Sequence, residues 1–458
     1  MENFLTCFNL NLEKTGLFSY FSCETFCLIG VLLNLFFYIF FKRKDFAKRF
    51  SDILTIGIFS LNILILVALG LFSGDIYSFD FSAFIANPKI ILNIFFLLYL
   101  LITYKIARKT RIKTSLLNAI LLTICLSSCL MVQNSNFILT FALLDLTIFF
   151  IYKYASSSRI RKDGVYSREF ILTSTASSIL FYSFCITSFF IKDAIQLSIL
   201  DVCTTIAILL KIGIFPIYNY LNNRNYKSNL PYSILLFVYL PFVGIFAFNK
   251  MISKMSLLNE VFQITILSFA IVSFICFAFF TIKQKNIVKF LAGASYCFAC
   301  FSIINILFIG QNDLSVIHSM LNTFAFLGIF SLLCILKINY YSDKINLSAI
   351  RGIFITSKKF AVLFAFLLLI ISNIIPSAFL KTNLEIVKNM YVFDNLSVYF
   401  LVFALLTNLF ITFNSFVIIK NCYTFDKNKE IIALTKRTTL NYVVPFVIIC
   451  FLLITIIL

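Results

Sequence analysis

The stretch Leu209-Leu210-Lys211-Ile212-Gly213-Ile214-Phe215-Pro216 places one lysine inside an apolar segment that otherwise has the character of a membrane helix. A charge within the bilayer core costs at least ~2.5–3.5 kcal/mol on insertion scales, so a lysine at this depth indicates a functional site. The proline that follows predicts a break in the helix beside the lysine, and broken helices often line ion pathways. The alternative is a lysine whose side chain snorkels to the membrane surface.

Composition points to the same class of protein. Of the 458 residues, 61% are hydrophobic and 12% are charged, with 59 Phe and no Trp. A soluble domain typically has ~25% charged residues, so these values predict an all-α polytopic membrane protein. Apolar runs near the ~20 residues that span a bilayer predict fourteen transmembrane helices. The runs lie near 17–41, 53–73, 90–106, 116–132, 137–155, 169–191, 197–220, 231–249, 258–282, 286–309, 316–336, 360–381, 394–419 and 440–458.

The net charge of +19 is arranged as a topology signal and does not indicate a nucleic-acid site. When the spans are numbered in order, the odd-numbered connections and the span ends beside them hold all but eight of the 38 Lys and Arg. The eight are Lys14, Lys89, Lys192, Lys250, Lys254 and Lys388 elsewhere outside the spans, and Lys211 and Lys381 inside them. The positive-inside rule then predicts that loops 42–52, 156–168 and 421–437 share the cytoplasmic side, with both termini opposite.

No connection between spans is long or polar enough for a soluble domain, so we expect one membrane-embedded unit over residues 1–458. The N-terminal segment has no basic region before the first span, and we expect no cleavable signal peptide. Most of the thirteen cysteines lie in apolar spans, where buried thiols are usually inert. Cys297-Phe298-Ala299-Cys300 has a redox or metal spacing, but no second pair accompanies it and we expect no metal site.

Charges inside the predicted spans are therefore the candidates for chemistry. Asp145 lies near the middle of the fifth span, and Lys381 lies near the end of the twelfth, after Pro376. Desolvation disfavours a charged lysine and a nearby carboxylate restores it, so Asp145 and Lys211 could take up and release a proton as a relay. The same two residues could instead form a static ion pair that locks two helices together.

Three other titratable residues lie in spans. His318, the only histidine of the chain, falls in the eleventh span and is either a relay member or an interfacial side chain. Glu24 and Asp201 lie closer to the ends of spans one and seven, where we expect them to be solvated.

Several motifs, taken in order, resemble the antiporter-like membrane subunits of respiratory NADH-quinone oxidoreductase (complex I), and most of all subunit N, called subunit 2 in mitochondria. Residues 141–146 are similar to that family's fifth-helix Phe-x-x-x-Glu-Leu motif, and residues 167–182 resemble its sixth helix. Residues 211–216 resemble its broken seventh helix with the central lysine, and residues 284–292 resemble the basic start of its tenth.

Two later stretches favour subunit N over its sister subunits. Phe326-Leu327-Gly328-Ile329-Phe330 resembles the Leu-Gly-x-Phe of subunit N. Arg351-Gly352, followed by Ser372 to Pro376 and Lys381, is similar to its twelfth helix, with a proline break and a lysine.

The resemblance implies fourteen helices in which helices 4–8 and 9–13 form two inverted five-helix repeats and helices 7 and 12 are broken. In this chain, helices 1–3 would occupy 1–115, the first repeat 116–250, the second repeat 256–420 and the last helix 438–458. The positions of Pro216 and Pro376, in spans five apart, fit a transporter with inverted repeats.

The resemblance further implies a proton-translocating subunit of an oxidoreductase, with Asp145, Lys211 and Lys381 as the relay and His318 as a possible member. Such a chain binds no cofactor itself. NADH, flavin, iron-sulfur clusters and quinone would be handled by partner subunits, and its own partners would be other membrane subunits and the lipid bilayer, with no nucleic acid. We expect it in the bacterial inner membrane, with the mitochondrial inner membrane as the alternative.

The sequence departs from the family at four points. Asp145 stands where the family has glutamate, residues 217–220 replace its Phe-His-x-Trp, and Phe298 stands in place of the tenth-helix histidine. The eighth-helix lysine is absent, with Pro241 and Phe242 near its place. Two alternatives therefore stay open: a subunit of a multi-subunit cation/proton antiporter, or a degenerate scaffold subunit that does not pump.

Overall fold

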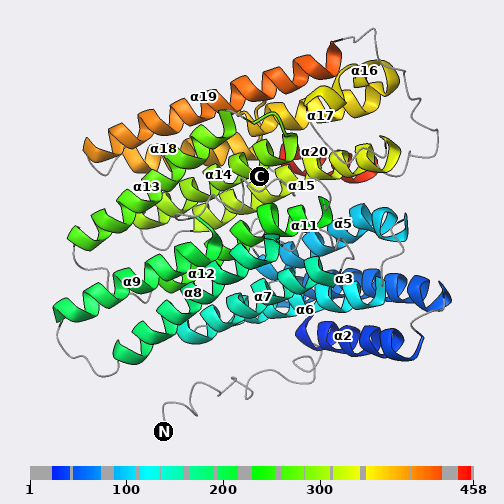
Figure 1. Ribbon diagram of the computed structural model, residues 1–458, viewed down its shortest axis with the longest axis horizontal. Helices are drawn as coiled ribbons and strands as arrows, with labels where there is room; N and C mark the ends of the chain where they lie inside the picture. Colours follow the sequence, from blue (N-terminus) through cyan, green and yellow to red (C-terminus); the bar gives the residue numbers. More distant parts are fainter. Residues whose placement is uncertain are drawn as a thin grey trace. The chain divides into compact units, whose positions relative to one another are not determined.

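The structure is a computed structural model that describes residues 23–41, 45–73, 87–109, 114–134, 136–157, 165–188, 194–214, 230–252, 260–282, 284–309, 313–340, 347–391, 395–424 and 442–454. The elements it describes are helices, which confirms the all-α prediction (Figure 1). In chain order they are α2 Cys23–Phe40, α3 Asp45–Ser73, α5 Pro88–Lys109, α6 Thr114–Gln133, α7 Phe137–Ser157, α8 Val165–Ser188, α9 Ala194–Ile212, α11 Leu230–Ile234, η2 Leu235–Tyr239, α12 Leu240–Ile252, α13 Glu260–Ile282, α14 Ile287–Ile309, α15 Asp313–Tyr340, η3 Leu347–Ile350, α16 Ile353–Thr356, α17 Lys358–Ile371, α18 Ala378–Tyr391, α19 Asn395–Tyr423 and α20 Val443–Ile454.

Every apolar run predicted from the sequence falls on a helix or on helices in series. The eighth run corresponds to α11, η2 and α12, and the twelfth corresponds to α17 and α18. Within the described residues, six helical stretches are long and apolar enough to cross a membrane. They are Cys23–Phe40, Phe46–Val67, Thr114–Gln133, Leu230–Ile252, Ile287–Leu307 and Leu314–Leu336. The number fourteen and the inverted repeat remain predictions.

Asparagine side chains fix the start of several helices. Oδ1 of Asn87 accepts a hydrogen bond from the backbone N–H of Lys89 at the start of α5, where Pro88 occupies the first helical position and has no N–H that needs an acceptor. Asn136 caps α7 through the backbone N–H of Ile138, and Asn286 caps α14 in the same way. These caps satisfy N–H groups that a bilayer would leave without partners.

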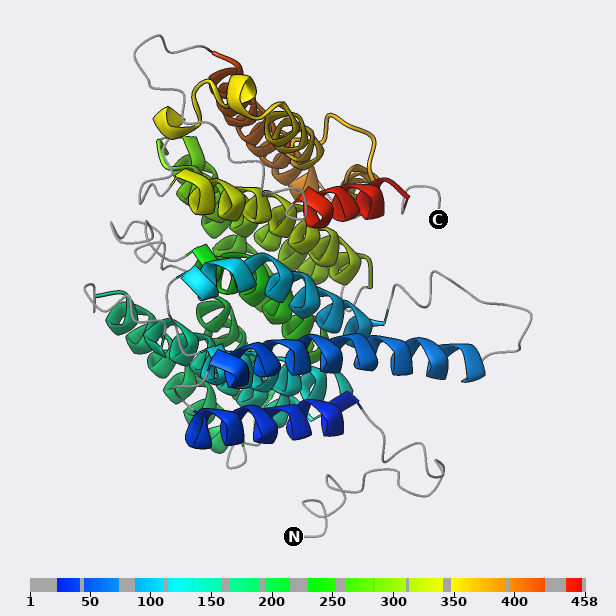
Figure 2. The same ribbon diagram turned by 90° about the vertical axis from the view of Figure 1, so that its right-hand side faces the viewer.

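Contacts divide the chain into two compact units. The first comprises Met1–Leu100 and Arg111–Ser158, and the second comprises Leu101–Thr110 and Arg159–Leu458. In the first, α6 packs against α2, α3 and α7, and Figure 2 shows α2 beside α3. In the second, α15 contacts α12, α14, α17, α18 and α20.

The two units differ in how deeply their apolar helices are buried. The segments Leu230–Ile252, Ile287–Leu307 and Leu314–Leu336 are almost entirely buried, so they form the core of the second unit. By contrast, Cys23–Phe40 is 33% buried and exposes Leu28, Leu32 and Ile39. Exposed apolar side chains in such numbers indicate a surface that meets lipid or another membrane subunit.

Candidate functional site

A glycine, Gly213, terminates helix α9. Gly213 has a φ of +85° and donates to the carbonyl of Leu210, while Ile214 donates to the carbonyl of Leu209. This pair of bonds is a Schellman motif, in which a residue in the left-handed conformation closes the helix. The sequence predicted the break from Pro216, but the helix already ends at Ile212, and Pro216 lies outside the described residues.

Lys211 lies in the last turn of α9 with its side chain held inside the second unit. The residue is 3% exposed. Its Nζ donates to the carbonyl oxygen of Ser174, at 2.8 Å, and to Oγ of Ser178, at 2.5 Å. Ser178 in turn donates to the carbonyl of Ser174 one helical turn earlier, at 2.8 Å. Burial and these bonds to α8 argue against a lysine that snorkels to the surface.

The helix that faces the end of α9 approaches it closely because of a second glycine. A Cβ on Gly244 of α12 would come within 2.5 Å of Cγ1 of Ile212, the residue after the lysine. Ile212 is fully buried there. Gly244 therefore lets α12 pack onto the end of α9, and together with Ser174 and Ser178 it fixes the position of Lys211.

The structure tests the predictions for only one of the three acidic residues identified from the sequence. Asp145 is half-buried on α7 in the first unit, whereas Lys211 belongs to the second, so their pairing stays a prediction. The expectation that Glu24 is solvated was wrong. Glu24 is buried and forms an ion pair with Lys89, with Nζ 2.7 Å from Oε1, because α2 and α5 bring the two side chains together in the first unit. The side chain of Asp201 lies outside the described residues.

The predicted twelfth span contains the same backbone break. Asn373 has a φ of +57°, donates to the carbonyl of Ile370, and is followed by Ile374, which donates to the carbonyl of Leu369. Asparagine tolerates this left-handed conformation better than other residues with side chains. The next helix, α18, begins at Ala378, two residues after Pro376.

An asparagine cluster surrounds this second break. The amide of Asn383, on α18, donates to Oδ1 of Asn373 at 2.9 Å, and the amide of Asn373 donates to Oδ1 of Asn408, on α19, at 3.3 Å. Thr412 also donates to the carbonyl of Ser372 at 3.2 Å. Three helical elements are therefore joined by neutral polar groups at the point where α17 ends.

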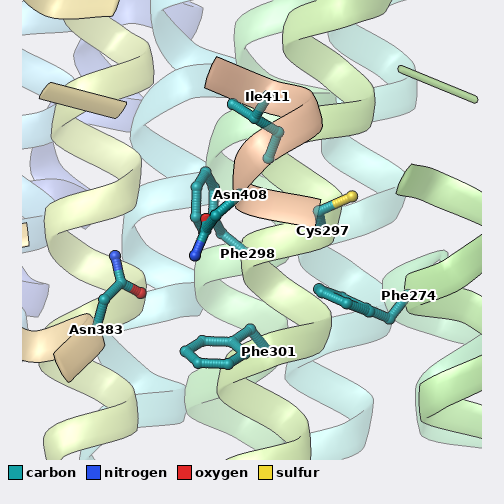
Figure 3. Close-up of a pocket in the computed structure, with 7 residues that line it drawn as sticks. All are labelled: Phe274, Cys297, Phe298, Phe301, Asn383, Asn408 and Ile411. Atoms are coloured by element: carbon teal, nitrogen blue, oxygen red, sulfur yellow. The ribbon is translucent and has the colours of Figure 1, made fainter. Parts of the chain in front are cut away.

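A small pocket adjoins this cluster. Figure 3 shows Asn383 and Asn408 pointing toward one another beside the rings of Phe298 and Phe301. This pocket has room for about one water molecule, and the two amides could supply partners for it. The lining residues are Phe274, Cys297, Phe298, Phe301, Asn383, Asn408 and Ile411.

His318 is fully buried on α15 and lies next to this cluster. Its Nδ1 is 2.7 Å from Oγ of Ser302, on α14, and the side chain of Asn383 lies near the ring. The ring of Phe298 packs edge-on to the imidazole, with centroids 6.1 Å apart. His318 therefore lies inside the protein, and its role as a relay member or as an interfacial side chain stays a prediction. The histidine from α15 lies beside Phe298, which stands where the family places a histidine in the tenth helix.

Lys381 is not part of this buried cluster. Its side chain is exposed on α18, while its neighbours Thr382 and Asn383 are buried. The polar groups that occupy the second break are asparagines, and neither these nor the serines around Lys211 were identified from the sequence. The signal for Asn383 is its position two residues after Lys381, on the opposite side of α18.

The eighth predicted span holds neutral groups where the family resemblance would place a lysine. Proline has no N–H, so Pro241 leaves the carbonyl of Phe237 without its helical donor. The chain forms a π-turn at η2, where Leu240 donates to Leu235. Ser295, on α14, donates to the carbonyl of Phe237 at 2.8 Å, and the hydroxyl of Tyr296 donates to the carbonyl of Leu236 at 3.2 Å. Neutral hydroxyl groups thus satisfy the backbone of this span.

No protein-family model matches the chain, and no curated protein matches it. Solved structures do share its fold. A chain of "Respiratory complex I from Thermus thermophilus with bound Aureothin" superposes with a TM-score of 0.74 at 14% identity, covering 95% of this chain and 97% of that chain. A chain of "the membrane-bound sulfane sulfur reductase (MBS), an archaeal respiratory membrane complex" superposes with a TM-score of 0.77 at 12% identity, covering 95% and 93%. The chain has the fold of a multi-pass membrane component found in these respiratory complexes.

Proposed function

We propose that this protein is a proton-translocating membrane subunit of a respiratory oxidoreductase complex, with subunit N of NADH-quinone oxidoreductase as its counterpart. One observation carries the proposal: a lysine, 3% exposed, lies at the closed end of α9 in a chain with the fold of respiratory-complex membrane components. Buried ionisable residues in membrane helices generally mark proton or ion routes.

The surroundings of Lys211 suit reversible protonation. Ser178 can accept from the ammonium because its own proton is directed to the carbonyl of Ser174. Both acceptors are neutral, so they orient the lysine without supplying a counter-charge. We assign that role to Asp145, whose negative charge would favour the protonated lysine when the two approach and favour proton release when they separate.

In the second half of the chain, the proposed route passes through His318 and the asparagine cluster. An imidazole can bind a proton on one nitrogen and release it from the other. Asparagine cannot titrate, but its amide can hold a water molecule between groups that do. His318 and its neighbour Asn383 would thus deliver protons toward the break, and Lys381 would be the outermost station, at the exposed surface of α18.

The proposal places this chain among other membrane subunits in the bacterial inner membrane, or in the mitochondrial inner membrane, with both termini away from the cytoplasm or matrix. Electron transfer from NADH through flavin and iron-sulfur clusters to quinone would take place in partner subunits. This chain would act in the enzyme as a translocase subunit and would bind none of those groups.

Three other functions compete with this one. A non-pumping scaffold role is favoured by the eighth span, where a π-turn and hydroxyl groups occupy the place of a lysine. Membership of another respiratory complex is favoured by the equally good superposition on the sulfane sulfur reductase component. A multi-subunit cation/proton antiporter remains the third possibility from the sequence.

Co-purification distinguishes these functions. The tagged chain, extracted in mild detergent, should bring down subunits that contain flavin and iron-sulfur clusters, together with NADH-quinone reductase activity. The isolated complex should acidify the lumen of vesicles when NADH is added. Recovery of antiporter-type subunits alone, or of a redox complex that does not use NADH, would refute the assignment to the subunit N type.

A further inference from the structure

Polar side chains line the interface between α14 and α15, two buried helices of the second unit that pack against each other. Asn305 donates to Oγ of Ser315 at 2.6 Å, and Oγ of Ser302 lies 2.7 Å from Nδ1 of His318. Closer to the start of α14, the amide of Asn322 donates to the backbone carbonyl of Ser295 at 3.5 Å. We call these three pairs the polar seam: Asn305 with Ser315, Ser302 with His318, and Ser295 with Asn322.

The spacing of the six residues along the two helices explains why they meet. Residues that lie three, four or seven positions apart share one face of an α-helix. The three seam residues of each helix have these spacings, and their numbers fall along α15 as they rise along α14, as expected of antiparallel neighbours. All six residues are at most 3% exposed. The seam is therefore a continuous polar strip inside the second unit.

Two side-chain oxygens of the seam have no hydrogen-bond partner among the described residues. They are Oδ1 of Asn305 and Oδ1 of Asn322. A buried polar oxygen without a partner costs free energy, because it has lost the water that bound it in the unfolded chain. Turning the amide of Asn305 by 180° would leave its Nδ2 without a partner in place of Oδ1, so one polar atom remains in either orientation. An internal water molecule is the usual partner of such a group.

The neighbours of the seam suit internal water. Ala299 on α14 and Ser319 on α15 lie between the second and third pairs on the same two helix faces, and both have small, buried side chains. Small side chains in a polar interface favour space for a water molecule. At the far end, the hydroxyl of Ser295 donates to the carbonyl of Phe237, next to the π-turn of the eighth span. The seam thus joins the surroundings of His318 to a second irregular stretch of backbone.

We propose that Asn305 and Asn322 are water-binding residues, each holding an internal water molecule through Oδ1, and that these waters complete a hydrogen-bonded path along α14 and α15 that includes His318. The water sites rest on the burial and the contacts of the seam. Their use in proton transfer rests on the proposed function. In that use, the imidazole takes up a proton on one nitrogen and releases one from the other to a bound water, which passes a proton to the next. The amides do not titrate and only hold the waters in place.

The first test is the position of ordered water in the intact complex, determined by electron cryomicroscopy at a resolution that shows water. The wild-type chain should have a water within about 2.7–3.2 Å of Oδ1 in both Asn305 and Asn322. Absence of water at either oxygen would overturn the proposal, whatever the pumping activity. Water at both oxygens in a complex that does not pump protons would refute the proposed function and leave the water sites standing.

The second test measures proton pumping by assembled variants. Asn322→Leu keeps a similar side-chain volume and removes the amide, so it should lose its water and pump severalfold more slowly. Asn322→Ser keeps a polar group that can bind water and should pump faster than Asn322→Leu. The matched control is Asn414→Leu on α19, whose amide also bonds a backbone carbonyl of a neighbouring helix, that of Thr281 at 3.4 Å, outside the seam.

The control Asn414→Leu should pump as the wild type does. Equal pumping by Asn322→Leu and Asn414→Leu would overturn the role of the seam in proton transfer. If Asn322→Leu does not assemble, the comparison of Asn322→Ser with wild type and the wild-type water positions still decide the proposal.

Discussion

The end of α9 and the end of α17 close with the same backbone motif but surround it with different side chains. At α9, Gly213 takes the left-handed position and Lys211 lies two residues before it. At α17, Asn373 takes that position and the residue two before it is Ile371. Each motif is followed by Ile, one apolar residue and Pro. The comparison teaches that the backbone break can be kept while the chemistry around it changes from a charged group to neutral amides.

The largest effect on stability is expected at the left-handed residue of the first break. Gly213→Val should lower the free energy of unfolding by up to about 3 kcal/mol, because a β-branched residue at positive φ is strained. Asn373→Gly at the second break is the matched variant. It keeps the backbone conformation and should cost about 1 kcal/mol through lost hydrogen bonds. Thermal unfolding in detergent would measure the stability of both variants. Equal losses of stability in Gly213→Val and Asn373→Gly would show that the two breaks are not closed by the same left-handed residue.

A somewhat smaller loss is expected from overpacking at the first break. Gly244→Ala places a methyl group against Ile212 and should destabilise the protein by about 1–2 kcal/mol, since overpacking costs more than the gain in helix propensity returns. The control is Gly57→Ala on α3, where a Cβ meets no atom within 4 Å. That change should be neutral or slightly stabilising. A neutral Gly244→Ala would mean that α12 does not hold the end of α9.

Removal of the hydroxyl partner of Lys211 tests how the lysine is positioned. Ser178→Ala should cost about 0.6–1.7 kcal/mol, the range for hydrogen bonds between membrane helices, and should lower proton pumping more than it lowers assembly. Ser183→Ala on the same helix removes an exposed hydroxyl that bonds only its own helix backbone in the described contacts. Equal pumping by the two variants would show that Ser178 does not position Lys211.

The smallest effect on stability is expected in the asparagine cluster. Asn383→Leu removes one neutral hydrogen bond to Asn373 and a polar group near His318, and should cost about 0.6 kcal/mol. Proton pumping should fall partially, because the cavity loses a polar partner for water. Leu384→Ala changes the exposed neighbour on α18 and should leave pumping unchanged. Full pumping by Asn383→Leu would exclude the asparagines from the route.

How far the sequence predicts this molecule depends on the range of the interactions involved. Apolar runs and helix caps are local, so the helices and the position of Lys211 within one of them could be predicted. The helix end at Gly213 could be predicted only approximately, because Pro216 gave the stronger signal although the glycine closes the helix. Long-range neighbours could not be predicted from one sequence. Ser178 beside Lys211, Asn383 beside His318 and Lys89 beside Glu24 depend on which helix faces meet.

The same reasoning explains the misjudged exposures. Lys381 was predicted to lie inside a span, as Lys211 was, but the span does not say which face of the helix carries it. On α18, however, the neighbouring residues Thr382 and Asn383 face inward and Lys381 faces outward. A shift of one residue along a helix turns a side chain by about 100°, so a span predicted to within several residues cannot tell inward from outward positions.

The most direct test of the central claim compares the same substitution at the equivalent positions of the two breaks. Lys211→Met keeps most of the side-chain volume and removes the titratable group, whereas Ile371→Met removes no titratable group. Membrane vesicles would be assayed for NADH-driven acidification together with quinone reduction, after assembly of the complex is verified. The account predicts that Lys211→Met loses most proton pumping and coupled turnover while Ile371→Met retains both. Normal pumping by an assembled Lys211→Met complex would contradict it and would make the buried lysine a structural residue.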